Sequence, residues 1–386
     1  MEHEPLFPRF SDAEYARRYT RVRAAMRAQG LDALLVYGTR AGSAEVQYLS
    51  NFIATWAAML VFPQDGDPVL LVQLYNHVPN ARRVAVVRDV RFGGEDLSAT
   101  TAAVLREQGL ANGRLGIVGP LPYRSHEALR QALPEATLAD WTRELLALRL
   151  IKSEEEFAWL RRGADLSDRA IAALAREARP GLTEHELADI VERAYVGLGG
   201  THGIHFLAVT SMHAPDRCVP AQTPSPRRVR RGDVLLTEIS AGYHGYTGQI
   251  LRPFSFGEPP TAHYQRLYEV CVEAFHRVAA AVRPGASTEA ILDAAEYIHA
   301  AGYTICDDLL HGYGGGYLPP ILRTRQTATG PQAPLTIQED MALVIQPNVI
   351  TPDERSGVQV GELGRVTARG WESLHRYPLQ FIQCPG

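Results

Sequence analysis

Two stretches of the sequence, "ARPGLTEHELADIVERAY" (residues 178–195) and "VRPGASTEAILDAAEYIH" (residues 282–299), are copies of one pattern. In each copy a Pro-Gly pair ends an amphipathic helix, and a Thr or Ser then caps the start of the next helix. Each half goes on to a strand pattern, "GDVLLTEIS" in the first and "EDMALVIQPNV" in the second. The repeat predicts two related helix–helix–strand units whose helices pack outside a shared, curved antiparallel sheet with polar side chains on its concave face.

The chain before this repeat alternates helix and strand patterns. Ser11 and Glu14 form a capping-box pattern, and Gly30 ends the helix that follows them. The strand patterns "DALLVYG", "AAMLVF", "PVLLVQL" and "RLGIVG" come next, separated by helical or polar stretches. We therefore predict an α/β fold with one domain over residues 1–148 and a second, repeat-containing domain over residues 149–386.

Composition and charge exclude several classes of protein. The net charge of −4 leaves no global basic field, so we expect neither nucleic acid nor an anionic membrane surface as a partner. The start, "MEHEPLFPRFSDAEY", lacks the basic tip and apolar run of a secretory signal, and no apolar run approaches the roughly 18 residues of a membrane span. The four cysteines are far apart and show no CxxC spacing, which disfavours a zinc knot or a disulfide framework. We expect a cytoplasmic protein.

The stretch "LLTEISAGYHGYTGQILRPF" (residues 235–254) is predicted to form a β-hairpin that carries chemistry. It places the carboxylate of Glu238 on one arm and the amide of Gln249 on the other. Superposing the two halves of the repeat brings Glu238 near Gln346 of the second strand pattern. The concave face is thus expected to hold a carboxylate and two amides together.

With "HGYGGG" (residues 311–316) and "MALVIQPNVITPDERSGVQVGE" (residues 341–362), the chain resembles the creatinase, prolidase and aminopeptidase P family, the pita-bread hydrolases. The likeness also covers "YTRVRAAMRAQGLDALLVYGTRAGSAEVQYLSNF", which is similar to the N-terminal domain of the family. It implies a creatinase-like α/β domain followed by a pita-bread domain that contains the active site. It also implies a homodimer.

The resemblance further implies where a metal site would lie. Metallopeptidases of this family hold two metal ions with two aspartates, one histidine and two glutamates. Position by position, these ligands fall on the following residues: Glu238, Gln249, His311, Gln346 and Gly361, with Glu362 next to the last. Three of the five positions carry no ionisable group, whereas hard divalent cations need several oxygen donors, preferably anionic. We therefore expect no bound metal and no other cofactor.

The predicted function is a metal-independent, creatinase-like hydrolase or lyase that acts on a C–N bond of a small amide, urea or guanidino-type metabolite. His311 is the expected acid/base, because its pKa range suits proton transfer near neutral pH, and Glu238 is its expected partner. The expected substrate-binding residues are Gln249, Gln346, Glu362, Tyr313, His205 and His213.

Departures from the family pattern leave two alternatives open. Further active-site histidines of the family fall on Ala221 and Leu318, and His213 or Cys218 could take over the first of these roles. A catalytically silent pita-bread domain that binds a partner is one alternative. A metal-dependent Xaa-Pro peptidase with atypical ligands is the other.

Overall fold

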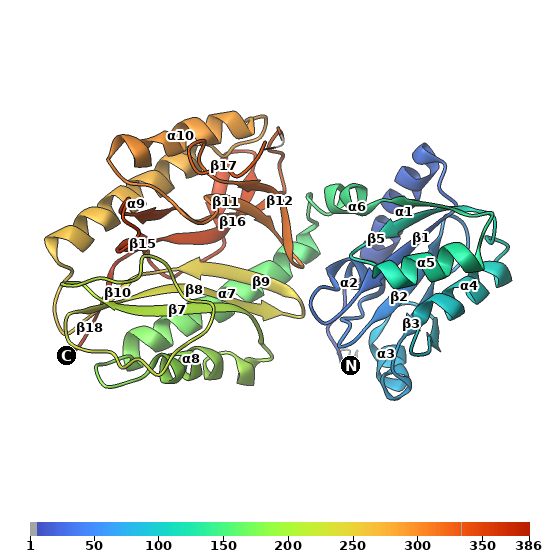
Figure 1. Cartoon of the computed structure of the whole chain (residues 1–386), viewed down its shortest axis with the longest axis horizontal. Helices are drawn as coiled ribbons and strands as arrows, with labels where there is room; N and C mark the ends of the chain where they lie inside the picture. Colours follow the sequence, from blue (N-terminus) through green and yellow to red (C-terminus); the bar gives the residue numbers. More distant parts are fainter. Residues whose placement is uncertain (1–5, 333) are drawn as a thin grey trace. The chain divides into compact units, whose positions relative to one another are not determined.

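The computed structural model describes residues 6–332 and 334–386. The first five residues, part of the stretch in which the sequence analysis found no secretory signal, lie outside the described residues. The chain divides into two compact units, the first ending at Arg149 and the second beginning at Leu150 (Figure 1). The sequence placed this boundary after residue 148, one residue earlier. No helix of the described chain is long and apolar enough to cross a membrane.

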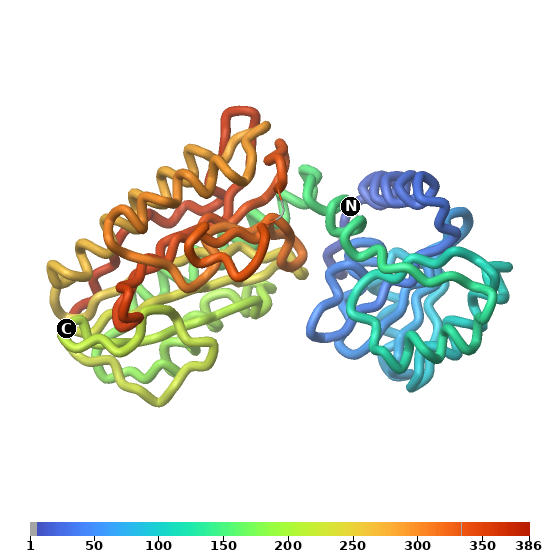
Figure 2. The backbone as a smooth tube through the Cα atoms, turned by 45° about the horizontal axis from the view of Figure 1, so that its top comes forward, coloured from blue at the N-terminus to red at the C-terminus, as the bar shows by residue number. Residues whose placement is uncertain are grey.

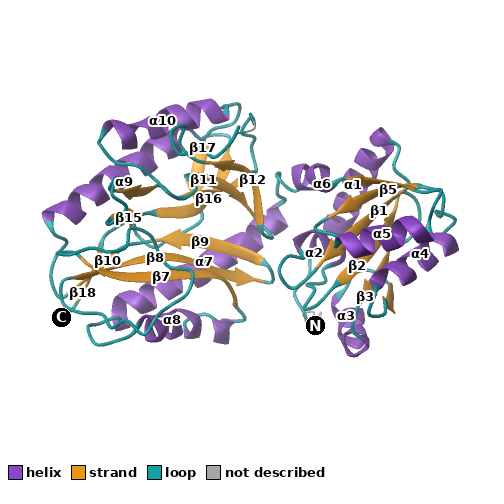
Figure 3. Cartoon of the chain, viewed as in Figure 1, coloured by secondary structure: helices purple, strands orange, loops and turns teal. Residues whose placement is uncertain are grey.

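The first unit is a mixed sheet with helices packed against it (Figure 3). The strand order is β4-β3-β2-β1-β5-β6; β1 pairs antiparallel with β2 and parallel with β5. The strands are β1 Ala33–Gly38, β2 Ala58–Pro63, β3 Val69–Val72, β4 Asp89–Phe92, β5 Arg114–Val118 and β6 Thr137–Asp140. The helices are α1 Asp12–Gln29, α2 Ala44–Ser50, η1 Tyr75–His77, α3 Val78–Val84, α4 Leu97–Glu107, α5 Tyr123–Ala132 and α6 Thr142–Leu148.

Local signals of the sequence account for these elements. The Ser11 side chain accepts a hydrogen bond from the Glu14 amide, while the Glu14 carboxylate binds Arg17 and Arg18. Helix α1 ends at Gly30, whose φ of 66° is the left-handed conformation that glycine adopts without strain. The four predicted strands correspond to β1, β2, β3 and β5, and their apolar residues form buried clusters.

The second unit shows the predicted repeat. Its helices come in two successive pairs, and α9 and α10 lie side by side in both views (Figures 1 and 2). They are α7 Glu154–Glu177, α8 Glu184–Arg193, α9 Ala262–Ala281 and α10 Thr288–Ala300, with η2 Val196–Leu198 after α8. Thr183 caps α8 and Ser287 caps α10, each two residues after the glycine of a Pro-Gly pair. Ser153 and Glu156 form a capping box at the start of α7.

The sheet of this unit has the strand order β12-β11-β13-β16-β9-β8-β10-β18, with β7 on β8 and β17 on β16. A separate ribbon pairs β14 with β15. The pairings are antiparallel except that of β10 with β18. The strands are β7 Thr201–Ser211, β8 Asp233–Tyr243, β9 Tyr246–Leu251, β10 Phe254–Phe256, β11 Leu310–Tyr313, β12 Tyr317–Leu322, β13 Ala342–Ile345, β14 Asn348–Ile350, β15 Gly357–Gln359, β16 Gly361–Thr367, β17 Gly370–Ser373 and β18 Ile382–Cys384.

The two faces of this sheet differ in character. Side chains that alternate with the polar ones, among them Ile239, Ala241 and Ile250, pack against α7 in the main core of the unit. Successive strand residues point to opposite faces, so the residues between them point away from the helix. The helix-free face is therefore where polar side chains can converge.

Candidate active site

Strand register brings the predicted polar residues to one face of the sheet. Ser240 pairs with Gln249 across β8 and β9, which places Glu238, two residues earlier, on the same face as Gln249. His311 of β11 pairs with Val344 of β13, and Gln346 follows two residues later, directly after that strand. Four side chains that lie far apart in the chain thus converge on the helix-free face.

Hydrogen bonds join three of these residues into a buried chain. The Gln249 Nε2 group donates to Glu238 Oε1 over 3.0 Å and also to Gln346 Oε1. Gln249 and Gln346 are buried and Glu238 is 6% exposed. The Gln249 Oε1 atom is buried and has no hydrogen-bond partner among the described residues. Because buried acceptors are normally paired, this atom marks a place for a ligand or a water. We call Glu238, Gln249, Gln346 and His311 the polar cradle.

Burial raises the pKa of the Glu238 carboxyl to about 8, and the negative charges of Asp307 and Asp308 act in the same direction. The charged form is disfavoured because little water reaches it. Glu238 is therefore mostly protonated at neutral pH. In that form it can donate a hydrogen bond or a proton.

His311 is fully buried and neutral. Its Nδ1 lies 3.1 Å from the Gly312 carbonyl oxygen, which can only accept, so Nδ1 carries the hydrogen. Burial lowers the pKa of the imidazole to about 4, and the Gly312 carbonyl, Asp308 and Gln346 offset this only in part. Gln346 approaches the ring, yet Nε2 has no hydrogen bond of ordinary geometry to any described residue. The Nε2 lone pair is available as a base.

Two tyrosines enclose the His311 ring. Tyr313 meets it edge-on at a centroid distance of 5.3 Å, and Tyr317 stacks on it at 3.9 Å. Tyr313 is buried, and burial raises the pKa of its hydroxyl. Tyr317 is 41% exposed, so its ring separates His311 from solvent. The Tyr317 hydroxyl donates to Asp308 Oδ2 over 3.3 Å.

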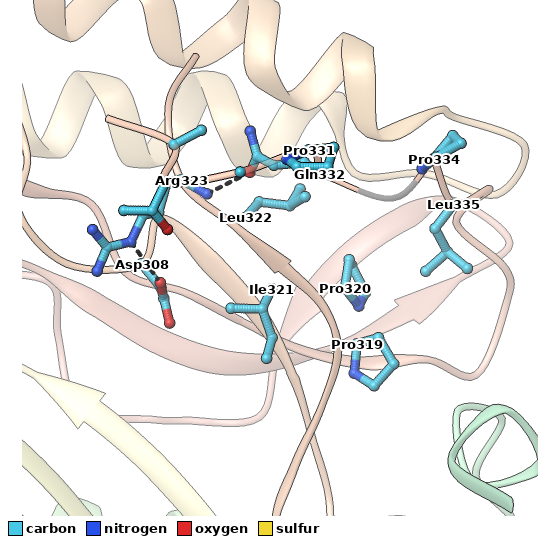
Figure 4. A pocket seen from close by; sticks show the side chains of 13 residues that line it. Asp308, Pro319, Pro320, Ile321, Leu322, Arg323, Pro331, Gln332, Pro334 and Leu335 are labelled. Carbon is cyan, nitrogen blue, oxygen red and sulfur yellow. Dashed lines mark hydrogen bonds and ion pairs between the residues drawn. The ribbon is translucent and has the colours of Figure 1, made fainter. Parts of the chain in front are cut away.

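Asp308, whose negative charge acts on Glu238 and His311, also lines a pocket (Figure 4), and none of the four residues of the polar cradle lines it. It lines this pocket together with residues 319–323 and a loop that includes Pro331 and Gln332. Arg323 Nε donates to Asp308 Oδ1 over 3.2 Å, and the Arg323 amide donates to Gln332. The pocket volume of about 420 Å³ falls within the roughly 300–1,000 Å³ of small-molecule sites. Asp308, Asp307 and Tyr317 are site residues that the sequence analysis missed.

The structure corrects the prediction for Glu362. Gly361 of β16 pairs with Leu251, on the face of Gln249, whereas Glu362 pairs with Ile250, on the face that packs against α7. The Glu362 carboxylate forms a buried ion pair with Arg252. Glu362 is therefore occupied on the opposite face and does not belong to the polar cradle.

The two predicted substrate-binding histidines also lie elsewhere. His205 pairs with Ile239, on the helix-covered face, and its Nε2 lies 2.6 Å from the Tyr195 hydroxyl. His213 is exposed, and its Nε2 contacts Glu258 at 2.9 Å. Neither ring reaches His311 or Glu238 by a hydrogen bond in the described chain. Ala221 exchanges backbone hydrogen bonds with Leu207, and the Cys218 backbone packs against Gly357 of β15.

The polar cradle does not fit a divalent cation. Within residues 6–332 and 334–386, no group of three or more His, Cys, Asp or Glu side chains is placed to hold a metal ion. The cradle supplies one imidazole and one carboxyl, and its other members are amides. A Cβ added at Gly361 would lie 2.5 Å from the Ile345 carbonyl oxygen and 2.9 Å from Gln346 Cβ, so a carboxylate there would require the backbone to shift.

Comparisons with solved structures support the architecture. The chain is similar to the X-Pro aminopeptidase of Thermotoga maritima, with a TM-score of 0.82 and 19% identity over 95% of this chain and 99% of that one. Among curated proteins, it is 27% identical to an uncharacterised hydrolase/peptidase, y4tL, of Sinorhizobium fredii, over 97% of both chains. It is 24% identical to the creatinase of a Bacillus species, over 97% of this chain and 93% of the relative.

Two family models cover almost the whole chain. Residues 18–151 match the creatinase/prolidase N-terminal domain, and residues 158–368 match metallopeptidase family M24. Both matches coincide with the two units of the fold, and the second contains the complete polar cradle. The chain therefore belongs to the M24 family of creatinases, prolidases and X-Pro aminopeptidases, with a creatinase-type N-terminal domain and a C-terminal pita-bread domain.

Proposed function

We propose that this protein is a metal-independent hydrolase that cleaves a C–N bond of a small amide, urea or guanidino-type molecule. The observation that carries the proposal is the pair of opposed pKa values in the polar cradle: about 4 for His311 and about 8 for Glu238. Between these values a neutral base and a neutral acid coexist in one buried site. Titratable groups whose pKa values are pushed apart in this way are typical of acid/base pairs.

His311 would act as the general base. Its Nδ1 hydrogen is held by the Gly312 carbonyl, so Nε2 faces the reaction with a lone pair. In the proposed step Nε2 takes a proton from a water molecule while the water oxygen attacks the carbonyl or guanidino carbon of the substrate. The ring stack with Tyr317 and the edge contact with Tyr313 fix the imidazole plane.

Glu238 would act as the general acid. Its proton passes to the leaving nitrogen as the C–N bond breaks, and the imidazolium of His311 then returns a proton to the carboxylate. No hydrogen bond joins Glu238 to His311 directly in the described residues; Gln249 and Gln346 link the two regions. Glu238 would therefore act on the leaving nitrogen rather than on His311 itself.

The two glutamines would hold the substrate. Gln249 Oε1, a buried acceptor that has no partner in the described part of the chain, suits the N–H groups of an amide, urea or guanidine. An uncharged cradle suits a neutral amide or urea, which brings no unpaired charge into the buried site, whereas a guanidinium would need the ionised form of Glu238 beside it. The 24% identity to a creatinase supports a small C–N substrate within this family.

The proposal is tested by kinetics on a panel of small amides, ureas and guanidino compounds, followed by release of ammonia or amine. We predict that His311→Ala and Glu238→Gln each lower kcat about 10²–10⁴-fold, the usual contribution of a general acid or base. Gln249→Ala should chiefly raise KM, because uniform binding leaves the chemical step unchanged.

His213→Ala is the matched control, since this histidine is exposed and lies outside the polar cradle. It should leave kcat and KM unchanged. Loss of a general base lowers kcat by far more than about tenfold. If His311→Ala keeps more than about a tenth of the wild-type kcat, His311 is therefore not the base.

A further inference from the structure

The second unit contains another pocket, which no residue of the polar cradle lines. It lies between one face of α7 and the segment that begins at the end of β17, and its volume of about 490 Å³ is in the range of small-molecule sites. Residues three or four apart share a helix face, so the α7 residues form one wall. The lining consists of Ala158, Arg161, Arg162, Asp165, Asp168, Ser373, Leu374, His375 and Arg376. We call it the arginine pocket.

A buried His–Asp pair joins the two walls of the arginine pocket. His375 Nδ1 lies 2.8 Å from Asp168 Oδ1, and the His375 side chain is fully buried. Asp168 Oδ2 also accepts the backbone amides of Arg376, over 2.7 Å, and Tyr377, over 3.3 Å. The carboxylate accepts all three bonds, so the imidazole hydrogen is on Nδ1. The segment after β17 is thus held against α7 with its histidine in one orientation.

The other nitrogen of this histidine has no partner. His375 Nε2 is buried and makes no hydrogen bond to any residue in the described part of the chain. Buried polar atoms are normally paired, so an unpaired one needs an explanation. A ligand in the arginine pocket, which His375 lines, would supply the missing partner.

The charge of the arginine pocket selects the kind of ligand. Arg161 lies 3.7 Å from Glu154 and Arg162 lies 3.5 Å from Asp165, and both arginines are partly exposed. Arg376 is exposed, and no described residue pairs with its guanidinium group. The three arginines of the lining outnumber its two aspartates, and protonation of the imidazole would add a further positive charge. The lining therefore favours an anion.

We propose that the arginine pocket binds the phosphoryl group of a small molecule. Guanidinium groups bind phosphate oxygens through paired N–H bonds. The oxygens of a phosphate point in several directions and can meet donors from α7 and from the segment after β17 together, whereas a carboxylate accepts close to one plane. With a proton on Nε2, His375 becomes a further donor, and the Asp168 carboxylate stabilises the imidazolium. Beside the phosphate, the wall at Ala158 and Leu374 leaves space for an organic group.

Isothermal titration calorimetry on the full chain tests the proposal with two probes, inorganic phosphate and phenyl phosphate. We expect both to bind at one site per chain, phenyl phosphate at least as tightly as phosphate, and acetate to give no binding at the same concentrations. Arg376→Gln should weaken the binding of phenyl phosphate about 10–100-fold, the usual effect of losing a hydrogen bond to a charged group. This side chain is exposed, so its replacement should leave the fold intact.

Arg176→Gln is the matched control, because this exposed arginine belongs to the same helix and does not line the arginine pocket. It should leave the affinity unchanged. His375→Gln should weaken phenyl phosphate by about tenfold or more. If this buried substitution prevents folding, the comparison of Arg376→Gln with Arg176→Gln decides alone.

Several results would overturn the proposal. They are the absence of binding of both probes to the wild-type chain, acetate binding as tight as phosphate binding, and an affinity that Arg376→Gln leaves unchanged or that Arg176→Gln lowers equally. Binding of inorganic phosphate without phenyl phosphate would overturn the assignment to a phosphorylated molecule. None of these measurements requires turnover, so they are independent of the proposed hydrolase activity.

Discussion

The chemistry of the candidate site depends on two residues that are both uncharged at neutral pH. Glu238 retains its proton and His311 lacks one because each is buried; the negative charge of Asp308 opposes the shift at His311 but does not outweigh the effect of burial. The amide of Gln249 can bond to a protonated or an ionised Glu238. The site is therefore ready for proton transfer without any net charge.

Replacing Glu238 should change how stability depends on pH. The folded protein keeps the Glu238 proton up to about pH 8, while the unfolded chain releases it near 4.5. The folded state thus binds more protons between these values, and stability falls as the pH rises through this window. Glu238→Gln removes this loss, so the stability of the variant relative to wild type should grow by about 4 kcal/mol from pH 4.5 to 8.

Chemical denaturation across this pH range measures the effect. Glu135→Gln makes the same carboxylate-to-amide change on an exposed loop and is the control for the substitution itself. Wild-type and Glu238→Gln curves that stay parallel from pH 4.5 to 8 would show that Glu238 ionises normally in the folded protein.

The sequence could identify part of this site and not the rest, for physical reasons. Glu238 and Gln249 were found because strand residues two apart share a face and a hairpin pairs its arms. Glu362 was misplaced because neighbouring strand residues face opposite sides, and the sequence does not show which side is helix-covered. Asp308 and Tyr317 were missed because their roles depend on pairing between β11 and β12 and on the loop before β11.

At the level of elements, close contact between α7 and the β8–β9 hairpin supports the polar cradle from behind. Gly248 of β9 faces Ala164 of α7, and Gly163 faces the backbone of Thr247. Ser167 of α7 bonds to the Gly248 carbonyl and to the Ala241 amide. The sequence predicted this helix as the amphipathic helix that ends at the first Pro-Gly pair. The glycine contacts and the parallel pairing of β10 with β18 are long-range features that no local pattern encodes.

Gly248→Ala should therefore destabilise the protein by roughly 3 kcal/mol or more, or prevent folding. A Cβ there would lie 2.2 Å from the Ala164 nitrogen, a backbone atom that cannot rotate away. Thermal and urea unfolding measure the loss. Gly197→Ala, with no atom within 4 Å of the added Cβ, should stay within about 0.5 kcal/mol of wild type. Equal stability of the two variants would argue against this packing.

At the level of the whole molecule, the candidate site is confined to one of the two units. The first unit has its own sheet and cores, and the polar cradle lies entirely within the second. The internal repeat made this organisation predictable, because each half must bury its helices on a common sheet. The predicted and observed boundaries between the units differ by one residue because no Gly/Ser linker marks the junction in the sequence.

We also propose that the protein is a homodimer, as the family resemblance implies. Sedimentation velocity on the purified chain should give a mass of twice 42.5 kDa at micromolar concentration. A species that remains at the mass of one chain as concentration rises would exclude a stable dimer.

The central claim is that the polar cradle works without a metal ion. Elemental analysis of the purified protein, repeated after incubation with Mn²⁺, Co²⁺ or Zn²⁺ and removal of free ions, tests it most directly. We predict a metal content well below one ion per chain in every case, because the amides of Gln249 and Gln346 and the absent side chain of Gly361 leave too few anionic ligands. About one or more tightly bound ions per chain, lost together with activity on chelation, would contradict the account and favour a metal-dependent peptidase with atypical ligands.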